Sequence, residues 1–299
     1  MSAKILENDK ISLQISPETG GGVAALKFHN GRNWVDILRP ATAAALTARD
    51  PQRMGCFASI PYVSRIRDGR FGFGGREYRL PPNQPPSAHP LHGVVWRRPG
   101  NITDQTADHV TVTHDISEED LPYRFSATQA WTVSGDTLSV TLSVTNTGAE
   151  LLPFGLGLHP FFNKTPQARI KTQVAKIITN DADVIPVSLD PLTPEQDFTR
   201  EFKTLSRLPV DNCFTGWSRM CEIEWPDLNA AITMTADPVF SFFVVCAPET
   251  ENWFCANPVT HFNDAFNNPI GLRETGLKTL ATRQTLSGTI ALKLRALAA

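Results

Sequence analysis

Long apolar runs are missing from this chain of 299 residues. No window reaches the ~18 uninterrupted apolar residues of a membrane helix. The opening segment MSAKILENDKISLQIS also lacks the apolar core of a secretion signal. We therefore expect a protein without a membrane partner that is located in the cytoplasm.

The chain also lacks a large excess of charge of either sign. The formal net charge is -2, and the 28 basic and 30 acidic residues form no long run. Nucleic-acid-binding proteins carry clustered Lys and Arg, so we expect no nucleic-acid partner. A neutral or weakly charged small ligand fits this balance better.

Cysteine is sparse and its spacing is irregular. The five cysteines include no CxxC pair, and an odd number in a chain without a signal peptide predicts neither a disulfide framework nor a zinc site. We expect all five to be reduced packing residues. They are Cys56, Cys213, Cys221, Cys246 and Cys255.

Several catalytic motifs are absent. The sequence contains no GxSxG, GxxxxGK[ST] or HExxH, which are the patterns of a nucleophile elbow, a phosphate-binding loop and a helical zinc site. The glycines of residues 69–75 (GRFGFGG) match no nucleotide-binding fingerprint. They predict a turn.

What the sequence does contain is strand patterning. Short apolar or alternating runs are separated by Gly, Pro, Asn and Asp, and residues 138–144 (LSVTLSV) alternate strictly. One apolar and one polar face favour an antiparallel sheet, while 23 prolines argue against long helices. No linker, repeat or change of composition divides the chain, so residues 1–299 are interpreted as one all-β domain.

Polar residues interrupt these apolar runs at four places. They are Ser64-Arg65-Ile66, Leu91-His92-Gly93, the segment GLGLHPFFN at residues 155–163, and Val210-Asp211-Asn212. A single histidine in an apolar run is more often a core residue than a functional one. The order of the four places along the chain is the stronger signal.

Taken in order, five segments resemble the landmarks of the aldose 1-epimerase (galactose mutarotase) family, and the resemblance extends over about residues 10–295. It implies a large antiparallel β-sandwich, the galactose mutarotase-like supersandwich, with few short helices and a monosaccharide held by its concave face and rim loops. The segments are SIPYVSRIRDGRFGFGGREYRLPPN, LHGVVW, PFGLGLHPFFN, VDNCF and NPVTHFNDAFN.

The resemblance also implies roles for four residues. Arg65 matches an arginine that binds sugar hydroxyls, and His92 a histidine that binds near the ring oxygen. His159 matches the general acid, and Asp211 an aspartate that accepts hydrogen bonds from hydroxyls. Without the resemblance, Arg65 could equally form a surface ion pair and Asp211 could cap a turn.

The chemistry explains why such residues are needed. Exchange of α and β anomers removes the proton of the C1 hydroxyl while the ring oxygen gains one, so that the ring opens, rotates about C1–C2 and closes on the other face. Histidine, with an ordinary pKa near ~6.5, can donate and recover a proton at neutral pH. No metal or organic cofactor is implied.

The sequence departs from the family at the general base. Asn257 stands where the family has a glutamate, and a neutral amide cannot take a proton near pH 7. Another group could replace the base, turnover could be slow and residual, or the protein could be a non-catalytic carbohydrate-binding or sensing protein. The replacement candidates are Glu249, Glu251, Asp264 and His261.

Two further features bear on the ligand. Trp96 and Trp217 lie within a few residues of landmarks and could stack on a sugar. Five arginines near two landmarks leave a hexose-6-phosphate epimerase open, because phosphate needs such donors. Alternatively, the four other than Arg65 are solvated or paired to Asp68 and Glu77. These arginines are Arg65, Arg67, Arg70, Arg97 and Arg98.

Overall fold

Alternating side chains form the longest strands of the computed structural model, which describes residues 3–208 and 210–297. In β11 (Thr137–Asn146) the side chains at 138, 140, 142 and 144 are buried and those between them are partly exposed. This strand pairs with β10 (Phe125–Ser134) on one side and β24 (Thr285–Arg295) on the other, both antiparallel. The predicted all-β, antiparallel architecture is confirmed.

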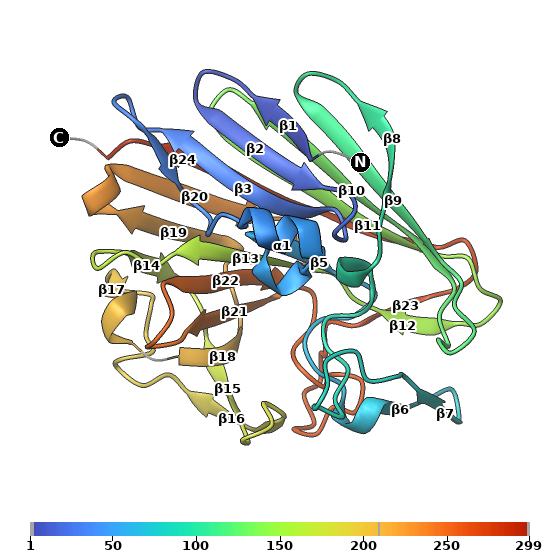
Figure 1. Cartoon of the computed structure of the whole chain (residues 1–299). Coiled ribbons are helices and arrows are strands. Elements are labelled where there is room, and N and C mark those ends of the chain that lie inside the picture. Colours follow the sequence, from blue (N-terminus) through green and yellow to red (C-terminus); the bar gives the residue numbers. More distant parts are fainter. Residues whose placement is uncertain (1–2, 209, 298–299) are drawn as a thin grey trace.

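The strands form two large sheets in the described part of the chain (Figure 1). The first is eleven-stranded, in the order β1-β2-β3-β5-β13-β22-β21-β18-β15-β16 with β4 added at β3. Its strands are β1 (Lys4–Glu7), β2 (Ile11–Ser16), β3 (Gly22–His29), β4 (Trp34–Asp36), β5 (Cys56–Ser59), β13 (Gly157–Asn163), β22 (Trp253–Val259), β21 (Phe242–Ala247), β18 (Val210–Thr215), β15 (Lys176–Asn180) and β16 (Pro186–Pro191).

The second sheet is nine-stranded, in the order β17-β14-β19-β20-β24-β11-β10-β9-β8. In addition to β10, β11 and β24, it contains β17 (Lys203–Thr204), β14 (Arg169–Thr172), β19 (Met220–Trp225), β20 (Ala230–Ala236), β9 (His109–Ile116) and β8 (Asn101–Gln105). Two small ribbons pair β6 (Arg70–Phe73) with β7 (Arg76–Arg79) and β12 (Leu152–Phe154) with β23 (Lys278–Leu280).

Helical segments are few and short, as predicted. The α-helix α1 begins after Thr42, whose side chain accepts a hydrogen bond from the backbone N–H of Ala45 and so caps the first turn. The helical elements are α1 (Ala43–Ala48) and the 3₁₀ turns η1 (Pro51–Arg53), η2 (Arg67–Gly69), η3 (Val95–Arg97), η4 (Leu205–Arg207) and η5 (Pro226–Leu228). Within the described ranges, no helix has the length and apolar character needed to cross a bilayer.

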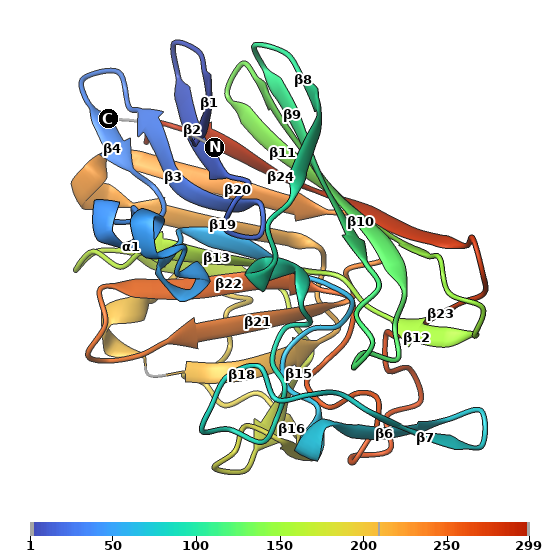
Figure 2. The same cartoon turned by 45° about the vertical axis from the view of Figure 1, so that its right-hand side comes forward.

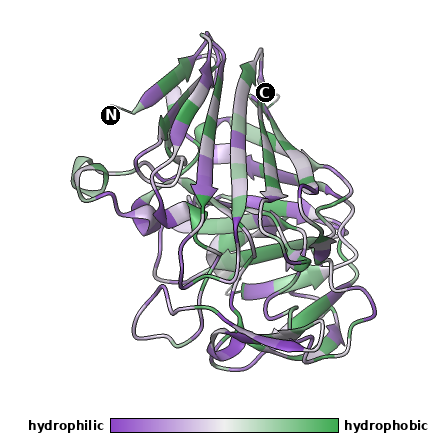
Figure 3. Cartoon of the chain, turned by 90° about the vertical axis from the view of Figure 1, so that its right-hand side faces the viewer, coloured by the Kyte–Doolittle hydropathy of each residue, from purple (hydrophilic) through white to green (hydrophobic). Residues whose placement is uncertain are grey.

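The core lies between the two large sheets. Strands β1–β3 lie over β10, β11 and β24 in two views (Figures 1 and 2). One apolar cluster joins residues of both sheets, such as Leu13 and Leu26 from the first and Trp131 and Val140 from the second. Figure 3 shows apolar and polar residues alternating along these strands, so that each sheet presents one apolar face to the other.

The glycine-rich segment forms the turn that the sequence predicts. Gly74 and Gly75 connect β6 to β7 with φ angles of 58° and 78°. A two-residue hairpin turn with positive φ at both positions is most easily made by glycine. Four of the five cysteines are buried, and Cys246 is partly exposed.

Candidate functional site

A cavity of about 340 Å³ lies on the central strands of the larger sheet. This volume is within the ~300–1,000 Å³ range of small-ligand pockets. Strand alternation builds its floor, because every second side chain of a strand faces the same side. From β22 these are Trp253, Cys255, Asn257 and Val259, and the neighbouring strands β5, β13, β18 and β21 supply residues in the same way.

The four landmark residues converge on this cavity although they are far apart in sequence. Arg65, His92, His159 and Asp211 all line it. His159 lies on β13 opposite Phe57 of β5, and Asp211 lies on β18. Arg65 and His92 come from the segments that follow β5 and precede η3, and an antiparallel bridge between Arg65 and Leu91 joins those two segments.

A close backbone approach holds the His92 segment. Gly93 has φ 68°, and a Cβ atom there would lie 2.0 Å from the carbonyl oxygen of Ile60. That carbonyl accepts a hydrogen bond from the backbone N–H of Val94 at 2.9 Å. Glycine is therefore required after His92, since any side chain would push this segment off the sheet.

His92 is held as a neutral donor. Its Nδ1 accepts a hydrogen bond from the backbone N–H of Ser64 at 3.1 Å and lies 3.1 Å from the hydroxyl of Ser59. This arrangement puts the ring proton on Nε2, which makes no hydrogen bond within the described chain. Burial, with the nearby charges of His159 and Arg65, lowers the pKa of His92 well below 6.5.

His159 lies among aromatic rings. Its ring stacks on Phe57 with centroids 4.6 Å apart and lies 4.7 Å from the ring of Phe161. The His92 ring contacts it edge-on at 4.9 Å, and the Cys255 thiol is 3.7 Å from its Nδ1. Burial among these groups lowers the pKa of His159 to about 4, so the His159 imidazole is neutral at pH 7.

Asp211 is the single carboxylate among the described residues that line the cavity. Desolvation by the surrounding walls raises the pKa of this side chain, although the Cys246 thiol and the Arg65 charge act in the opposite direction. Arg65 and Asp211 therefore place a donor and an acceptor on the same cavity.

Asn257 occupies the floor with an unpartnered oxygen. Its side chain is 3% exposed, and Oδ1 accepts no hydrogen bond from any described residue. A buried amide oxygen without a partner costs free energy in the empty protein. It is an acceptor, or by rotation of the amide a donor, that a ligand can satisfy.

The four groups considered as replacements for the base lie outside the cavity lining. Glu249 and Glu251 are exposed, and Glu251 accepts a hydrogen bond from the indole of Trp253. His261 is fully buried, with Nε2 accepting from the N–H of Val63 and Nδ1 donating to the carbonyl of Phe262. It is a satisfied core histidine.

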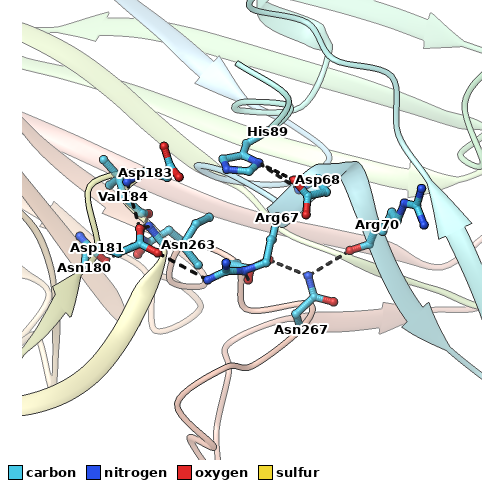
Figure 4. A network of polar contacts seen from close by, with 12 residues as sticks. Arg67, Asp68, Arg70, His89, Asn180, Asp181, Asp183, Val184, Asn263 and Asn267 are labelled. Atoms are coloured by element: carbon cyan, nitrogen blue, oxygen red, sulfur yellow. Dashed lines mark hydrogen bonds and ion pairs between the residues drawn. The ribbon is translucent and has the colours of Figure 1, made fainter. Parts of the chain in front are cut away.

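Asp264, the remaining candidate, contacts Arg67 and Asn267, which belong to a network of polar contacts beside the cavity. Figure 4 labels Arg67, Asp181 and Asn267 of this network. The Oδ1 of Asp264 accepts hydrogen bonds from the backbone N–H of Arg67 and the amide of Asn267. The Arg67 guanidinium lies 3.6 Å from Asp181 and 3.9 Å from Asp264. The network ties the loops after β5, β15 and β22 to one another beside the cavity.

The two tryptophan predictions have different outcomes. Trp96 lines the cavity, stacked on Phe57 at 4.9 Å. Trp217 does not: it is buried in the core, stacked on Phe243 at 4.5 Å, with its indole N–H donated to Thr172. Residues 244 and 246 of β21 face the cavity, so Phe243 and the Trp217 ring on it face the opposite side.

The arginine cluster does not converge. Of the five arginines near the landmarks, Arg65 alone lines the cavity. Arg67 pairs with Asp181 and Asp264, and Arg98 pairs with Glu118 at 2.5 Å, rather than with the expected Asp68 and Glu77. The Arg97 guanidinium lies 4.3 Å from the centre of the Trp96 ring. A phosphate site built from this cluster is therefore not formed.

Arg39 and Trp253 are among the cavity residues that were not predicted. Arg39 lines the cavity with its guanidinium 4.2 Å from the centre of the Phe161 ring, and Trp253 lies 5.0 Å from that same ring. Trp253 could have been found from strand alternation, because it is four residues before Asn257 on one strand. Arg39 lies in a loop and carries no such signal.

Comparisons with known proteins identify the family and the fold. The family model described as aldose 1-epimerase matches residues 4–292. The uncharacterized protein YphB of Escherichia coli K12 is 33% identical over 279 residues, which are 91% of this chain and 92% of YphB.

Solved structures are similar over the same extent. A putative aldose 1-epimerase from Escherichia coli K12 superposes with a TM-score of 0.89 at 28% identity, covering 99% of both chains. A galactose mutarotase-like protein from Clostridium acetobutylicum gives a TM-score of 0.86 at 22% identity, covering 96% of this chain and 93% of that one. The chain belongs to the aldose 1-epimerase family.

Proposed function

We propose that the cavity binds the ring form of a free aldose and promotes the exchange of its α and β anomers. The supporting observation is that Arg65, His92, His159 and Asp211 line one cavity. Such a set supplies donors, an acceptor and a titrating group to a ligand rich in hydroxyls.

In this proposal each binding group contacts a different part of the sugar. Arg65 donates to one hydroxyl, and Asp211 accepts from another. The free Nε2–H of His92 donates to an oxygen near the ring. The aromatic wall around Phe57 packs on the apolar face of the ring.

His159 donates a proton to the ring oxygen when the ring opens and takes it back when the ring closes. Because the pKa of His159 is about 4 in the empty cavity, the protonated fraction grows as the pH falls from 7, and the rate of ring opening grows with it. Asn257 orients the C1 hydroxyl, and water takes its proton, since an amide cannot. Turnover is therefore slow compared with an enzyme that holds a carboxylate at this position.

Polarimetry of D-galactose and D-glucose mutarotation tests the proposal. We expect a rate above that of buffer, a further increase of roughly 10²-fold or more in Asn257→Glu because a positioned base is restored, and loss of that increase when His159→Ala is added. His109→Ala, on β9 of the other sheet, is the matched control and should leave the rate unchanged.

The second candidate function is carbohydrate binding without turnover, which Asn257 favours. Sugar binding in calorimetry, with mutarotation at the buffer rate in both the wild type and Asn257→Glu, would support it against the first. Absence of binding of any monosaccharide would contradict both.

A further inference from the structure

The cavity wall carries more positive than negative charge. Two guanidiniums, Arg39 and Arg65, face it together with one carboxylate, Asp211, in the described chain. The histidines are neutral near pH 7 for the reasons given above, and Asn257 adds no charge. A glutamate at position 257 would balance the second guanidinium, and this chain has none.

Arg39 is the cation without a counter-ion. Its Nη2 donates to the carbonyl oxygens of Gln52 at 2.7 Å and Met54 at 2.9 Å. Nη1 and Nε make no hydrogen bond within the described residues, and Nε is buried. No described carboxylate lies within ion-pair distance of this guanidinium, and the carboxylates of Glu251 and Asp50 act on it only from beyond that distance. The charge on the wall therefore has no direct counter-ion.

Burial makes this charge expensive. The guanidinium lies 4.2 Å from the ring centre of Phe161 and 5.5 Å from that of Trp253. Removal from water lowers the pKa of Arg39. Aromatic faces and carbonyl oxygens stabilise a cation partly, but full compensation needs an anion, and a buried charge without one destabilises the protein.

The position of Arg39 indicates which part of a sugar meets it. Phe161 contacts both Arg39 and His159. The Arg39 guanidinium lies over the Phe161 ring, and the ring centroids of His159 and Phe161 are 4.7 Å apart. In the proposed function His159 exchanges a proton with the ring oxygen. That oxygen is bonded to C1 and to C5, and C5 carries C6. Because the proposed function assigns the C1 hydroxyl to Asn257, the substituent on C6 is the exocyclic group left for Arg39, the neighbour of His159 on the Phe161 ring.

We propose that the aldose bound here carries an anionic group on C6, a carboxylate as in a hexuronic acid, and that Arg39 binds it. The inference rests on the proposed function and adds the substrate class. A carboxylate accepts from the free nitrogens of a guanidinium in charge-assisted hydrogen bonds. It also supplies the counter-charge that the cavity wall lacks.

Calorimetric titration with D-galacturonate and D-galactose, and with D-glucuronate and D-glucose, tests the inference. We expect the uronate of each pair to bind at least about tenfold more tightly. This advantage should shrink between about 20 mM and about 500 mM NaCl, a range over which the Debye length falls severalfold. Galactose 6-phosphate is the third arm, because a phosphate on C6 offers the same charge in a larger group.

Variants separate the role of Arg39 from the fold. Arg39→Gln should remove the preference for the uronate, so that the uronate and the neutral sugar of each pair bind with similar affinity. Asn257→Glu should weaken uronate binding by adding a negative charge to the floor. Arg76→Gln is the matched control, because Arg76 is 69% exposed and pairs with Glu150 outside the cavity. If Arg39→Gln does not fold, the salt dependence and Asn257→Glu still decide.

The outcomes are distinct. Equal or weaker binding of the uronate than of the neutral sugar would overturn the inference and leave the proposed function standing. Tighter binding of the 6-phosphate than of the uronate would overturn the assignment of a carboxylate. If Arg39→Gln lowers the affinity for the uronate and for the neutral sugar by the same factor, Arg39 has a structural role instead. Failure of every monosaccharide to bind would contradict the proposed function itself.

Discussion

At the scale of single residues, His92 and Gly93 show how one position depends on its neighbour. Gly93 lets the backbone pass against the Ile60 carbonyl, and His92 itself has φ 57°, in the left-handed region. The backbone N–H of Ser64 then fixes the tautomer of the His92 ring. The side chain that faces the ligand is thus oriented by two backbone contacts.

Gly93→Ala should therefore destabilise the protein strongly. The added Cβ would lie 2.0 Å from the Ile60 oxygen, and alanine also disfavours the positive φ. We expect the free energy of unfolding to fall by about 3 kcal/mol or more, measured by urea denaturation. Gly74→Ala is the control, because that Cβ meets nothing within 4 Å and φ is 58°; its cost should stay near ~1 kcal/mol. Equal losses in both variants would refute the steric argument.

The residues of the site were predictable to different degrees. Arg65, His92, His159, Asp211 and Asn257 were proposed because each stands at a position of the landmark segments of the family that the sequence resembles, and all five line the cavity. Trp217 was misplaced because proximity to a landmark in sequence does not reveal which face of a strand a neighbouring ring covers. Arg39 was missed because its approach to Phe161 joins a loop to a distant strand.

At the scale of elements, the loops beside the cavity are held by polar contacts and not by apolar packing alone. The network of Figure 4 joins η2 to the loops after β15 and β22 through Arg67, whose guanidinium lies near both Asp181 and Asp264. Asp264 is buried, and desolvation raises the pKa of this carboxyl. Arg67 therefore offsets a carboxylate that water cannot reach.

Arg67→Gln should loosen these loops. The partly exposed pair contributes little on its own, so we expect the free energy of unfolding to fall by only about 1 kcal/mol. The larger effect should be faster amide hydrogen exchange at residues 180–185 and 261–268. Arg79→Gln, which breaks an exposed pair with Glu77, is the matched control and should leave exchange in both loops unchanged. Unaltered exchange in Arg67→Gln would contradict the proposed link.

The strands themselves were easier to predict than the order in which they pair. Alternation gave the two faces of β11 from seven residues, since the period of two is a local property. The order β5-β13-β22-β21-β18, which builds the cavity, joins strands from distant parts of the chain. Such pairings depend on loop closure and on packing between sheets, which no local pattern encodes. The resemblance to a family implied a β-sandwich with a concave face but gave no strand order.

At the scale of the whole molecule, four buried histidines, His92 among them, are kept neutral inside the fold. Burial lowers the pKa of His114, His159 and His261 to about 4 each. In the unfolded chain each has a pKa near ~6.5. Between these two values the unfolded chain binds protons that the folded chain does not.

Stability should therefore fall as the pH decreases from about 6.5 to 4. Each histidine contributes a loss of up to about 3 kcal/mol, whereas the raised pKa values of Asp211 and Asp264 act in the opposite direction. Urea denaturation at pH 7, 6 and 5 measures the trend. His114→Gln should flatten it, and His109→Ala, near the surface, should not. A free energy of unfolding that is constant over this range would contradict the assignment.

The placement of β24 has a consequence for how the protein is made. This strand is the last in the described chain, yet it lies between β20 and β11 in the middle of the nine-stranded sheet. During translation, the flanking strands have exposed edges until the C-terminal segment leaves the ribosome. We therefore expect incomplete chains to pair with one another through the edges of β11 and β20 more readily than chains in which β24 is in place.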